Sequence, residues 1–448
     1  MVDFKGIVPT NPNPIRFLFI LFSLSIMPKF CLIHSHLNGR GGSQRYCVEM
    51  ALELQDMGHE VSILCLVHDR ELCYPQMTKR LDIHALISLD TNVNTSNRVD
   101  PESQSCRHYY FTHFIYNLLP RHSSGGLVKS WVVMIIKFTF HIVLHRNIID
   151  DTHIIIHEEP VSTWAFQLSR YFYRIKSINW LCYDTPLKWL ETWNTSSHET
   201  FLSTLLSTIF LKLDSLIISS LSPKSWVLDY RQSKLFLMQY NSYPKVLGGA
   251  VAPDMYAEPH IYSRTGIIGC ATNFQFRKNV QFFIDLALVL QALGKLNCFR
   301  FKLNIARCDP HCENKFFTKL SKYPEINTVF DVRTNPFSGD DEYKEYLDSC
   351  QWFVYPNSLQ TWGHAPLEAM CRNTYTLISE GCGITDFMNF EPITKCVFNI
   401  ADPHGVADAI VRSDSSHTLY NSIVDSQYSW SRQFSWTKQL YPILGSLV

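Results

Sequence analysis

The sequence predicts an α/β protein built from two Rossmann-like domains. Its 448 residues are enough for two domains of ordinary size. An apolar strand, a loop with glycines, an amphipathic helix and a second strand follow one another at residues 29–65. A similar alternation begins at residue 265, after a glycine pair at residues 248–249 that marks a linker. Two such units predict two parallel sheets.

The composition is that of a globular protein. Hydrophobic residues make up 46% of the chain and charged residues 18%. Forty basic residues balance forty acidic ones, so no global field attracts nucleic acid. We therefore expect no nucleic-acid partner.

The fourteen cysteines are scattered and form no C-x-x-C pair. Several, such as Cys31 and Cys350, lie inside apolar runs, which is typical of buried, reduced thiols in a cytosolic protein. We therefore expect a cytoplasmic location. Cys308 and Cys312 form the only tight cluster, and without a second pair of ligands we expect no zinc site there.

Near the N-terminus only residues 15–26 are mostly apolar. This apolar run is too short to span a bilayer. We expect residues 1–27 to be an extension without ordered structure, with Met27 as a candidate for the true start. A membrane-contacting segment and a signal peptide are the alternatives. Elsewhere, no run predicts a transmembrane helix.

In the first domain, a strand at residues 29–34 leads into a loop that contains Gly41 and Gly42. A helix is expected at residues 43–57, where apolar residues repeat with helical spacing, and a strand at residues 60–65. Glycines at the first turn of such a unit suit nucleotide binding, and a tight turn needed only for packing is the alternative.

Residues 130–145 are strongly apolar, with Lys137 inside the run and Lys129 and Arg146 at its ends. We favour a helix that packs in the core. The alternative is a helix that lies on a membrane surface through its apolar and basic side chains.

Further strands of the first domain are expected at residues 153–157, 177–182 and 215–220. The second of these ends at Tyr183 and Asp184. Ligands bind at the carboxyl ends of parallel strands, so these two polar side chains are candidate binding residues.

In the second domain we expect a strand at residues 265–271, a loop at 272–279, a helix at 280–293 and a strand at 301–305. Lys278 lies in that loop, where it is placed to contact a phosphate. A merely solvated lysine is the alternative.

The most informative stretch is residues 355–387. A short apolar strand at residues 352–355 ends in a polar loop that contains Gly363. A helix is expected at residues 365–371, opened by a proline in its first turn. The free N–H groups at the start of such a helix suit a phosphate, and Glu368, one turn in, is placed to reach a sugar hydroxyl.

The run S-L-Q-T-W-G-H-A-P-L-E-A-M resembles the Glu-x7-Glu segment of family 4 of the retaining glycosyltransferases (glycosyl transferases group 1), S-x-x-E-G-F-G-x-P-x-x-E-A-M. Gly363, Pro366, Glu368, Ala369 and Met370 match. The opening G-G-S-Q-R-Y and the later G-H-E-V-S are similar to the family's opening, and the match extends with gaps from about residue 28 to the end.

The resemblance implies the GT-B fold, in which two Rossmann-like domains with parallel sheets face a central cleft. The domains so expected are an N-terminal acceptor domain at residues 28–247 and a C-terminal nucleotide-sugar-binding domain at residues 248–425. A C-terminal helix within residues 426–448 would return to the first domain.

The resemblance also implies roles for single residues. Lys278 matches the diphosphate-binding lysine, Glu368 matches the residue that holds the ribose, and Gln360 stands at the first Glu of the motif; these three are the catalytic candidates. The donor-binding residues so implied are Gly41, Gly42, Asn273, Lys278, Gln360, Trp362, Gly363, His364, Ala365 and Glu368. The implied acceptor-binding residues are Tyr183 and Asp184.

Three positions depart from the family's pattern: Gln360 replaces a Glu, Asn273 replaces an Arg and Tyr183 replaces a His. The expected function is transfer of a sugar, a hexose by preference, from a nucleotide diphosphate sugar to a hydroxyl of a glycan or lipid-linked acceptor, with retention of configuration. The alternative is a non-catalytic nucleotide-sugar-binding homologue or a transferase subunit. A Rossmann oxidoreductase is disfavoured, because the opening loop lacks G-x-G-x-x-G.

We expect no metal and no cofactor. No D-x-D occurs in the chain, so the carboxylate pair that holds a divalent ion on a donor diphosphate is missing. Lys278 and helix dipoles would supply the positive charge instead.

Overall fold

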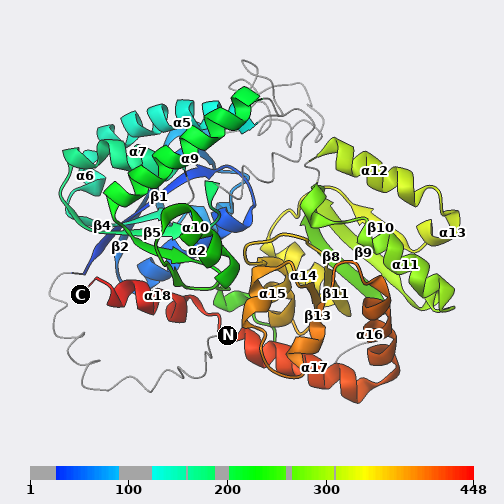
Figure 1. Cartoon of the computed structure of the whole chain (residues 1–448). Helices are drawn as coiled ribbons and strands as arrows, with labels where there is room; N and C mark the ends of the chain where they lie inside the picture. Colours follow the sequence, from blue (N-terminus) through cyan, green and yellow to red (C-terminus); the bar gives the residue numbers. More distant parts are fainter. Residues whose placement is uncertain are drawn as a thin grey trace, which may run out of the picture.

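The computed structural model describes residues 27–89, 124–157, 160–186, 201–258, 265–306 and 309–447. Two parallel β-sheets, each covered by helices, form the two halves of the molecule (Figure 1). The predicted α/β architecture with two Rossmann-like domains is therefore confirmed. Residues 1–26 and Cys308, which carried predictions, lie outside the described residues.

The first sheet has seven parallel strands in the order β3-β2-β1-β4-β5-β6-β7. The strands are β1 (Lys29–Leu37), β2 (Glu60–Asp69), β3 (Asp82–Leu89), β4 (Thr152–His157), β5 (Ile175–Cys182), β6 (Lys224–Val227) and β7 (Lys245–Val246). Its helices are α2 (Gly42–Asp56), α3 (Pro75–Thr78), α5 (Ser124–Leu144), α6 (Arg146–Ile149), α7 (Val161–Ser169), α9 (Phe201–Leu221) and α10 (Tyr230–Tyr240).

The second sheet has six parallel strands in the order β10-β9-β8-β11-β12-β13. The strands are β8 (Ile267–Asn273), β9 (Arg300–Ala306), β10 (Phe330–Arg333), β11 (Trp352–Tyr355), β12 (Tyr375–Ser379) and β13 (Val397–Phe398). The helices that follow the linker are α11 (Phe282–Ala292), α12 (Pro310–Leu320), α13 (Pro324–Asn327), α14 (Asp340–Ser349), α15 (His364–Cys371), α16 (Pro403–Ser415), α17 (His417–Ser431) and α18 (Trp436–Gly445).

The central strands are apolar on both faces because helices cover both faces of each sheet. In β1, Phe30 and Leu32 pack in the core that contains α2, whereas Cys31 and Ile33 pack in the core that contains α5, α7 and α9. This alternation explains why the predicted strand reads as a continuous apolar run.

The order of strands reverses once in each sheet, between β1 and β4 and between β8 and β11. Loops that leave such neighbouring strands in opposite directions open a crevice at their carboxyl ends, where α/β proteins bind ligands. The loop with Gly41 and Gly42 follows β1, Lys278 follows β8, and the loop with Gln360 follows β11. The topology thus brings the predicted site residues to the two crevices.

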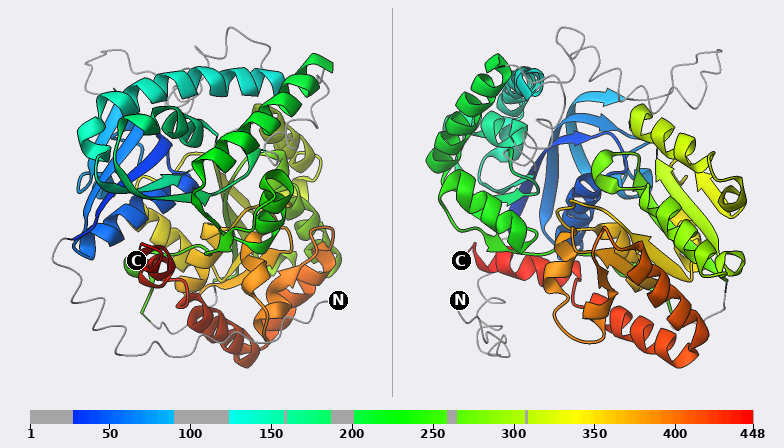
Figure 2. Two further views of the ribbon diagram at one scale, coloured as in Figure 1. Left: turned by 60° about the vertical axis from the view of Figure 1, so that its left-hand side comes forward. Right: turned by 45° about the vertical axis from the view of Figure 1, so that its right-hand side comes forward.

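The chain ends by returning to the first domain (Figure 2). Trp436 of α18 donates a hydrogen bond from Nε1 to Oε2 of Glu49 in α2, at 2.7 Å, and the Tyr46 and Trp436 rings lie 4.5 Å apart. Thr437 donates to Glu53, at 2.6 Å. These contacts attach the last helix to the first domain rather than to the second.

The strand predicted at residues 215–220 is wrong, because these residues form the last turns of the 21-residue helix α9. A short apolar run reads equally well as a strand or as part of a buried helix. Its neighbour Asp214 is buried on the inner side of α9, where it accepts hydrogen bonds from Trp164, at 2.6 Å, and Tyr240, at 2.7 Å. The strand itself follows at β6.

The prediction that no run beyond the N-terminus suits a membrane span also needs correction. Within the described residues, one helix is long and apolar enough to cross a membrane, the segment Thr204–Leu221 of α9. Serines and one aspartate interrupt the apolar residues of this segment, so the sequence shows no unbroken apolar run there.

Candidate active site

A cavity of about 290 Å³ lies between the two domains, at the carboxyl ends of both sheets. Most of the predicted site residues line it: Gly41, Gly42, Tyr183, Asn273, Lys278, Gln360, His364, Ala365 and Glu368. The cavity therefore gathers residues that are widely separated in the sequence.

Lys278 and Gln360 form a pair on the wall of the second domain. Lys278 ends the short 3-10 turn η3 (Phe276–Lys278) after β8, and its Nζ atom donates a hydrogen bond to Oε1 of Gln360. An ammonium group has no acceptor, so the amide oxygen of Gln360 must face the lysine. The amide N–H groups of Gln360 are the part left to contact a ligand.

The helix α15 begins at the cavity with its first N–H groups uncapped by any side chain. Its N-cap residue, Gly363, has φ = 109°, a left-handed conformation that favours glycine. Pro366 stands in the first turn, where it removes no intrahelical hydrogen bond. The start of α15 is therefore a local source of positive electrostatic potential.

Three buried polar atoms along the cavity have no hydrogen-bond partner within the described part of the chain: Thr272 Oγ1, Asn273 Oδ1 and His364 Nε2. Buried polar atoms of proteins are nearly always hydrogen-bonded. The residues that carry these atoms all line the cavity, so a polar ligand bound there is a candidate partner for them.

His364 is neutral at physiological pH. Burial of its ring, with a further contribution from the nearby Arg45 guanidinium, lowers the pKa of His364 to about 3. The imidazole can therefore exchange hydrogen bonds with a ligand but carries no charge. The charge on the cavity wall near Gln360 comes from Lys278.

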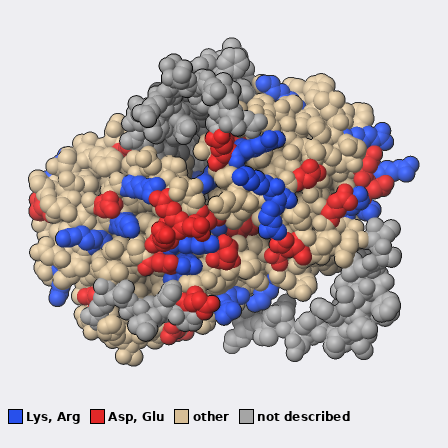
Figure 3. All heavy atoms as spheres, turned by 180° about the vertical axis from the view of Figure 1, so that it is seen from behind, with Lys and Arg blue, Asp and Glu red and all other residues tan. Residues whose placement is uncertain are grey.

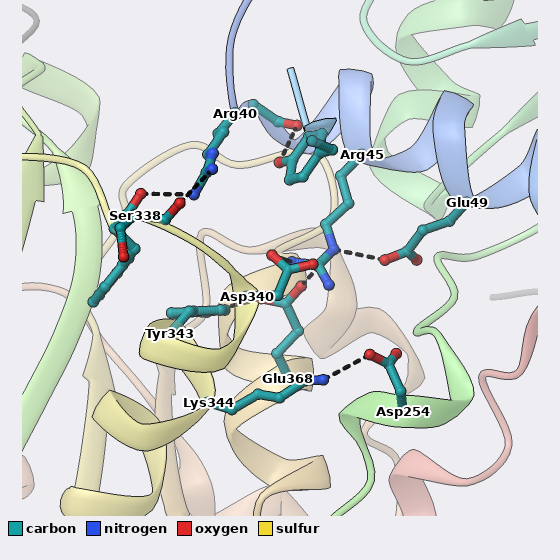
Figure 4. A network of polar contacts seen from close by, with 12 residues as sticks. Arg40, Arg45, Glu49, Asp254, Ser338, Asp340, Tyr343, Lys344 and Glu368 are labelled. Atoms are coloured by element: carbon teal, nitrogen blue, oxygen red, sulfur yellow. Dashed lines mark hydrogen bonds and ion pairs between the residues drawn. The ribbon is translucent and has the colours of Figure 1, made fainter. Parts of the chain in front are cut away.

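Arg45, in the second turn of α2, joins the two domains through a buried charge network (Figure 4). Its Nε atom lies 2.6 Å from Oε1 of Glu49 and 3.4 Å from Oε1 of Glu368, and its Nη1 atom lies 3.6 Å from Oδ1 of Asp340. The hydroxyl of Tyr343 donates to Oε2 of Glu368, at 2.8 Å. Glu368 is thus held in place from both domains.

The pKa values in this network reflect burial and the shared cation. Burial alone would lower the pKa of Arg45, but Glu368, Glu49 and Asp340 together raise it well above its ordinary value. Burial raises the pKa of Glu49, and Arg45 and Trp436 oppose that rise. Glu49, Glu368 and Asp340 thus share one buried cation, the Arg45 guanidinium.

Arg40 makes a second contact across the cleft. Its Nη1 and Nη2 atoms donate to the backbone oxygens of Phe337, at 2.6 Å, and Ser338, at 2.8 Å. Figure 4 shows Arg40 and Arg45 reaching from the first domain toward the same part of the second domain. The two arginines thus connect the first domain to the second across the cleft.

Arg40, Arg45 and Tyr343 were not among the site residues predicted from the sequence. Arg45 lies within the run G-G-S-Q-R-Y that was matched to the family, so its position was a usable signal. No local pattern marks Tyr343, which comes from a helix far away in the chain.

The structure does not bring the side chain of Trp362 to the cavity. The ring is fully buried, packs 5.1 Å from Phe387 and 5.3 Å from Phe434, and lies over the linker, where a Cβ atom on Gly249 would overlap it. The Trp362 ring therefore packs among aromatic side chains and against the linker. The predicted donor contact of Trp362 is therefore replaced by a role in packing.

Gly363 and Asp184 do not line the cavity either. Gly363 shapes the start of α15, as described above. Asp184 accepts a hydrogen bond from the Thr361 hydroxyl across the domain boundary, whereas its neighbour Tyr183 does line the cavity.

Two facing parallel-sheet domains with a cavity at the carboxyl ends of their strands form the GT-B class of fold, and glycosyltransferases of that class are among the structural neighbours. Anabaena HepE in complex with UDP and glucose has a TM-score of 0.64 and 10% identity, over 94% of this chain and 99% of that one. Sucrose-phosphate synthase from Thermosynechococcus elongatus has a TM-score of 0.59 and 14% identity, over 94% and 100%.

A third structure, trehalose-6-phosphate from E. coli bound with UDP-2-fluoro glucose, has a TM-score of 0.64 and 10% identity, over 94% and 98%. These identities show a shared fold. No family model matches the sequence, and no curated protein matches it.

Proposed function

We propose that this protein is a retaining glycosyltransferase of the family 4 type, which moves a hexose from a nucleotide diphosphate sugar to an acceptor hydroxyl. The pairing of Lys278 with Gln360 beside the uncapped start of α15 is the observation that carries the proposal. Structural neighbours were solved with UDP or UDP-sugars, which supports a donor of this chemistry.

The donor diphosphate would lie between Lys278 and the first N–H groups of α15. The bond from the sugar's anomeric carbon to the diphosphate breaks, and negative charge accumulates on the departing oxygen. Lys278 and the helix amides stabilise that charge. The acceptor oxygen bonds to the anomeric carbon on the same face, and its proton passes to a donor phosphate oxygen.

Glu368 would hold the ribose of the donor. Arg45 and Tyr343 orient its carboxylate, and each carboxylate oxygen has capacity for a further hydrogen bond. Gln360 and His364 would contact the sugar hydroxyls, and Asn273 the diphosphate side of the donor.

The acceptor would enter beside Tyr183, between the two domains. A glycan or a lipid-linked saccharide offers the hydroxyl that the reaction needs, and we place the reaction in the cytoplasm. Figure 3 shows basic and acidic side chains intermingled on the rear face of the molecule, which suits neutral acceptors better than nucleic acid.

The proposed reaction needs no metal ion, because Lys278 and the start of α15 provide the positive charge. EDTA is expected to leave the initial rate unchanged in a coupled assay for released nucleoside diphosphate. Loss of activity on chelation, with recovery after manganese is added, would contradict the proposal.

A substitution at Gln360 distinguishes the proposed transferase from a non-catalytic nucleotide-sugar-binding homologue. We expect the parent protein to turn over, and Gln360→Glu to change the ranking of donor sugars, since the change replaces the amide NH2 group, with its two N–H donors, with one further acceptor oxygen. Initial rates and binding for a panel of nucleotide sugars measure both effects.

The matched control is Gln291→Glu, the same change at an exposed position of α11, which should leave the ranking unaltered. A parent that binds donors but never turns over, beside an active Gln360→Glu variant, would show that this chain has lost catalysis.

A further inference from the structure

Helices α5 and α9 lie side by side over the outer side of the seven-stranded sheet (Figures 1 and 2). Aromatic side chains pack between their inner sides and the core. The ring centroid of Phe210 in α9 lies 5.2 Å from that of Trp131 in α5 and 4.7 Å from that of Trp164 in α7. Phe138 and Ile142 of α5 are fully buried beneath them. The orientation of both helices is therefore fixed by the core.

The opposite sides of the two helices are apolar and exposed. In α5 these residues recur every fourth position, which places them on one side of the helix. We call the following set the α5–α9 face: Val132, Ile136, Phe140 and Leu144 of α5, and Leu205, Leu206, Ile209, Leu213 and Leu216 of α9. Phe140, Leu144 and Leu216 are the most exposed, at 68%, 76% and 67%. Large exposed apolar side chains gathered on two neighbouring helices mark an interaction site.

Basic side chains outnumber acidic ones around the α5–α9 face, and Asp150, which directly follows α6, is paired with Arg146 at 2.9 Å. Within residues 124–149, 160–186 and 201–227 the only carboxylates belong to Asp184 and Asp214, and both are buried. Lys137 and Lys212 are exposed on the two helices themselves. The whole chain has no net charge, whereas this region carries an excess of basic side chains. Its charge therefore complements an anionic surface.

We propose that the α5–α9 face docks onto the surface of an anionic lipid membrane. Exposed leucine, isoleucine and phenylalanine side chains would enter the interface while Lys137 and Lys212 meet the headgroups. The helices lie on the membrane and do not cross it, because a spanning α9 would separate Asp214 from Trp164 and Tyr240 and place its carboxyl group in lipid. This inference is independent of the donor chemistry proposed above.

Flotation with vesicles tests the proposal without any sugar substrate. The full chain should float with vesicles of phosphatidylglycerol and phosphatidylcholine, and less with phosphatidylcholine alone. Leu144→Asp/Leu216→Asp should weaken binding to the mixed vesicles about tenfold or more. Lys137→Gln/Lys212→Gln, which leaves the apolar residues in place, should also weaken it about tenfold at low salt.

The matched control is Leu293→Asp/Leu419→Asp, which makes the same chemical change at exposed leucines of the second domain (53% and 39% exposed). It should bind vesicles like the parent. The proposal is overturned if the parent does not float with anionic vesicles, or if the control loses binding as strongly. A parent that is dimeric in light scattering, with a monomeric Leu144→Asp/Leu216→Asp variant, would instead assign the face to a second copy of the chain.

Discussion

Lys278→Met is expected to lower kcat/KM about ten- to a hundredfold, mainly through kcat, with the fold intact. The substitution keeps an unbranched apolar stem but removes a buried cation that donates to Gln360 and would face the donor diphosphate. A hydrogen bond to a charged group contributes about 1.5–3 kcal/mol. Because charge builds up on the diphosphate as the bond breaks, the loss is larger in the transition state than in the ground state.

The control for this variant is Lys319→Met, which removes a lysine paired with Asp285 at 2.6 Å on α11 and α12, outside the cavity lining. Initial rates at several donor concentrations, with circular dichroism of both variants, make the comparison. Equal kcat/KM for the parent and Lys278→Met would show that this lysine is only a structural partner of Gln360.

Arg45→Met is expected to reduce the free energy of unfolding by about 3–5 kcal/mol, the typical effect of removing one partner of a buried ion pair. The variant leaves Glu49 and Glu368 buried, with side-chain exposures of 4% and 6%, and without their shared cation. Urea unfolding of the parent and the variant measures the difference. Arg412→Met, which removes an exposed i,i+4 pair with Asp408, should change stability by less than about 1 kcal/mol.

The pH dependence tests the same mechanism. Burial already raises the pKa of Glu49, and without Arg45 it rises further. A carboxyl group whose pKa is raised in the folded state favours folding below its unfolded pKa, and this contribution is lost as the pH increases through the folded value. The destabilisation by Arg45→Met should therefore be larger at neutral than at mildly acidic pH. A loss that does not change with pH would assign the effect to packing alone.

Donor binding should also weaken in Arg45→Met, because Glu368 loses one of the two groups that orient it. Isothermal titration with a nucleoside diphosphate measures this loss. Adding Glu49→Gln to Arg45→Met should recover part of the stability by removing one unpaired charge, but not the donor affinity, which depends on Glu368.

The local elements and much of the candidate site could be predicted from the sequence. Hydrophobic periodicity and glycine position are local signals, and they predicted β1, α2, β2 and α15 close to their observed bounds. Lys278 and Gln360 were predicted from a resemblance and from their loops, and the structure places both on the cavity. Loops that follow neighbouring parallel strands must meet at one edge of the sheet, so these positions follow from the chain order once the strands are known.

The sequence by itself thus determined the α/β class, the two Rossmann-like units and the loops that carry the site. Only the tertiary structure decided which side chains of those loops face the cavity: Trp362, between Gln360 and His364, turns into the core. It also decided that residues 215–220 continue a helix, that Arg45 reaches Glu368 across the cleft, and that α5 and α9 each leave large apolar side chains exposed. Each of these depends on contacts between segments far apart in the chain. The periodicity of a single segment does not say which other segment packs against it, or whether one side of it stays exposed.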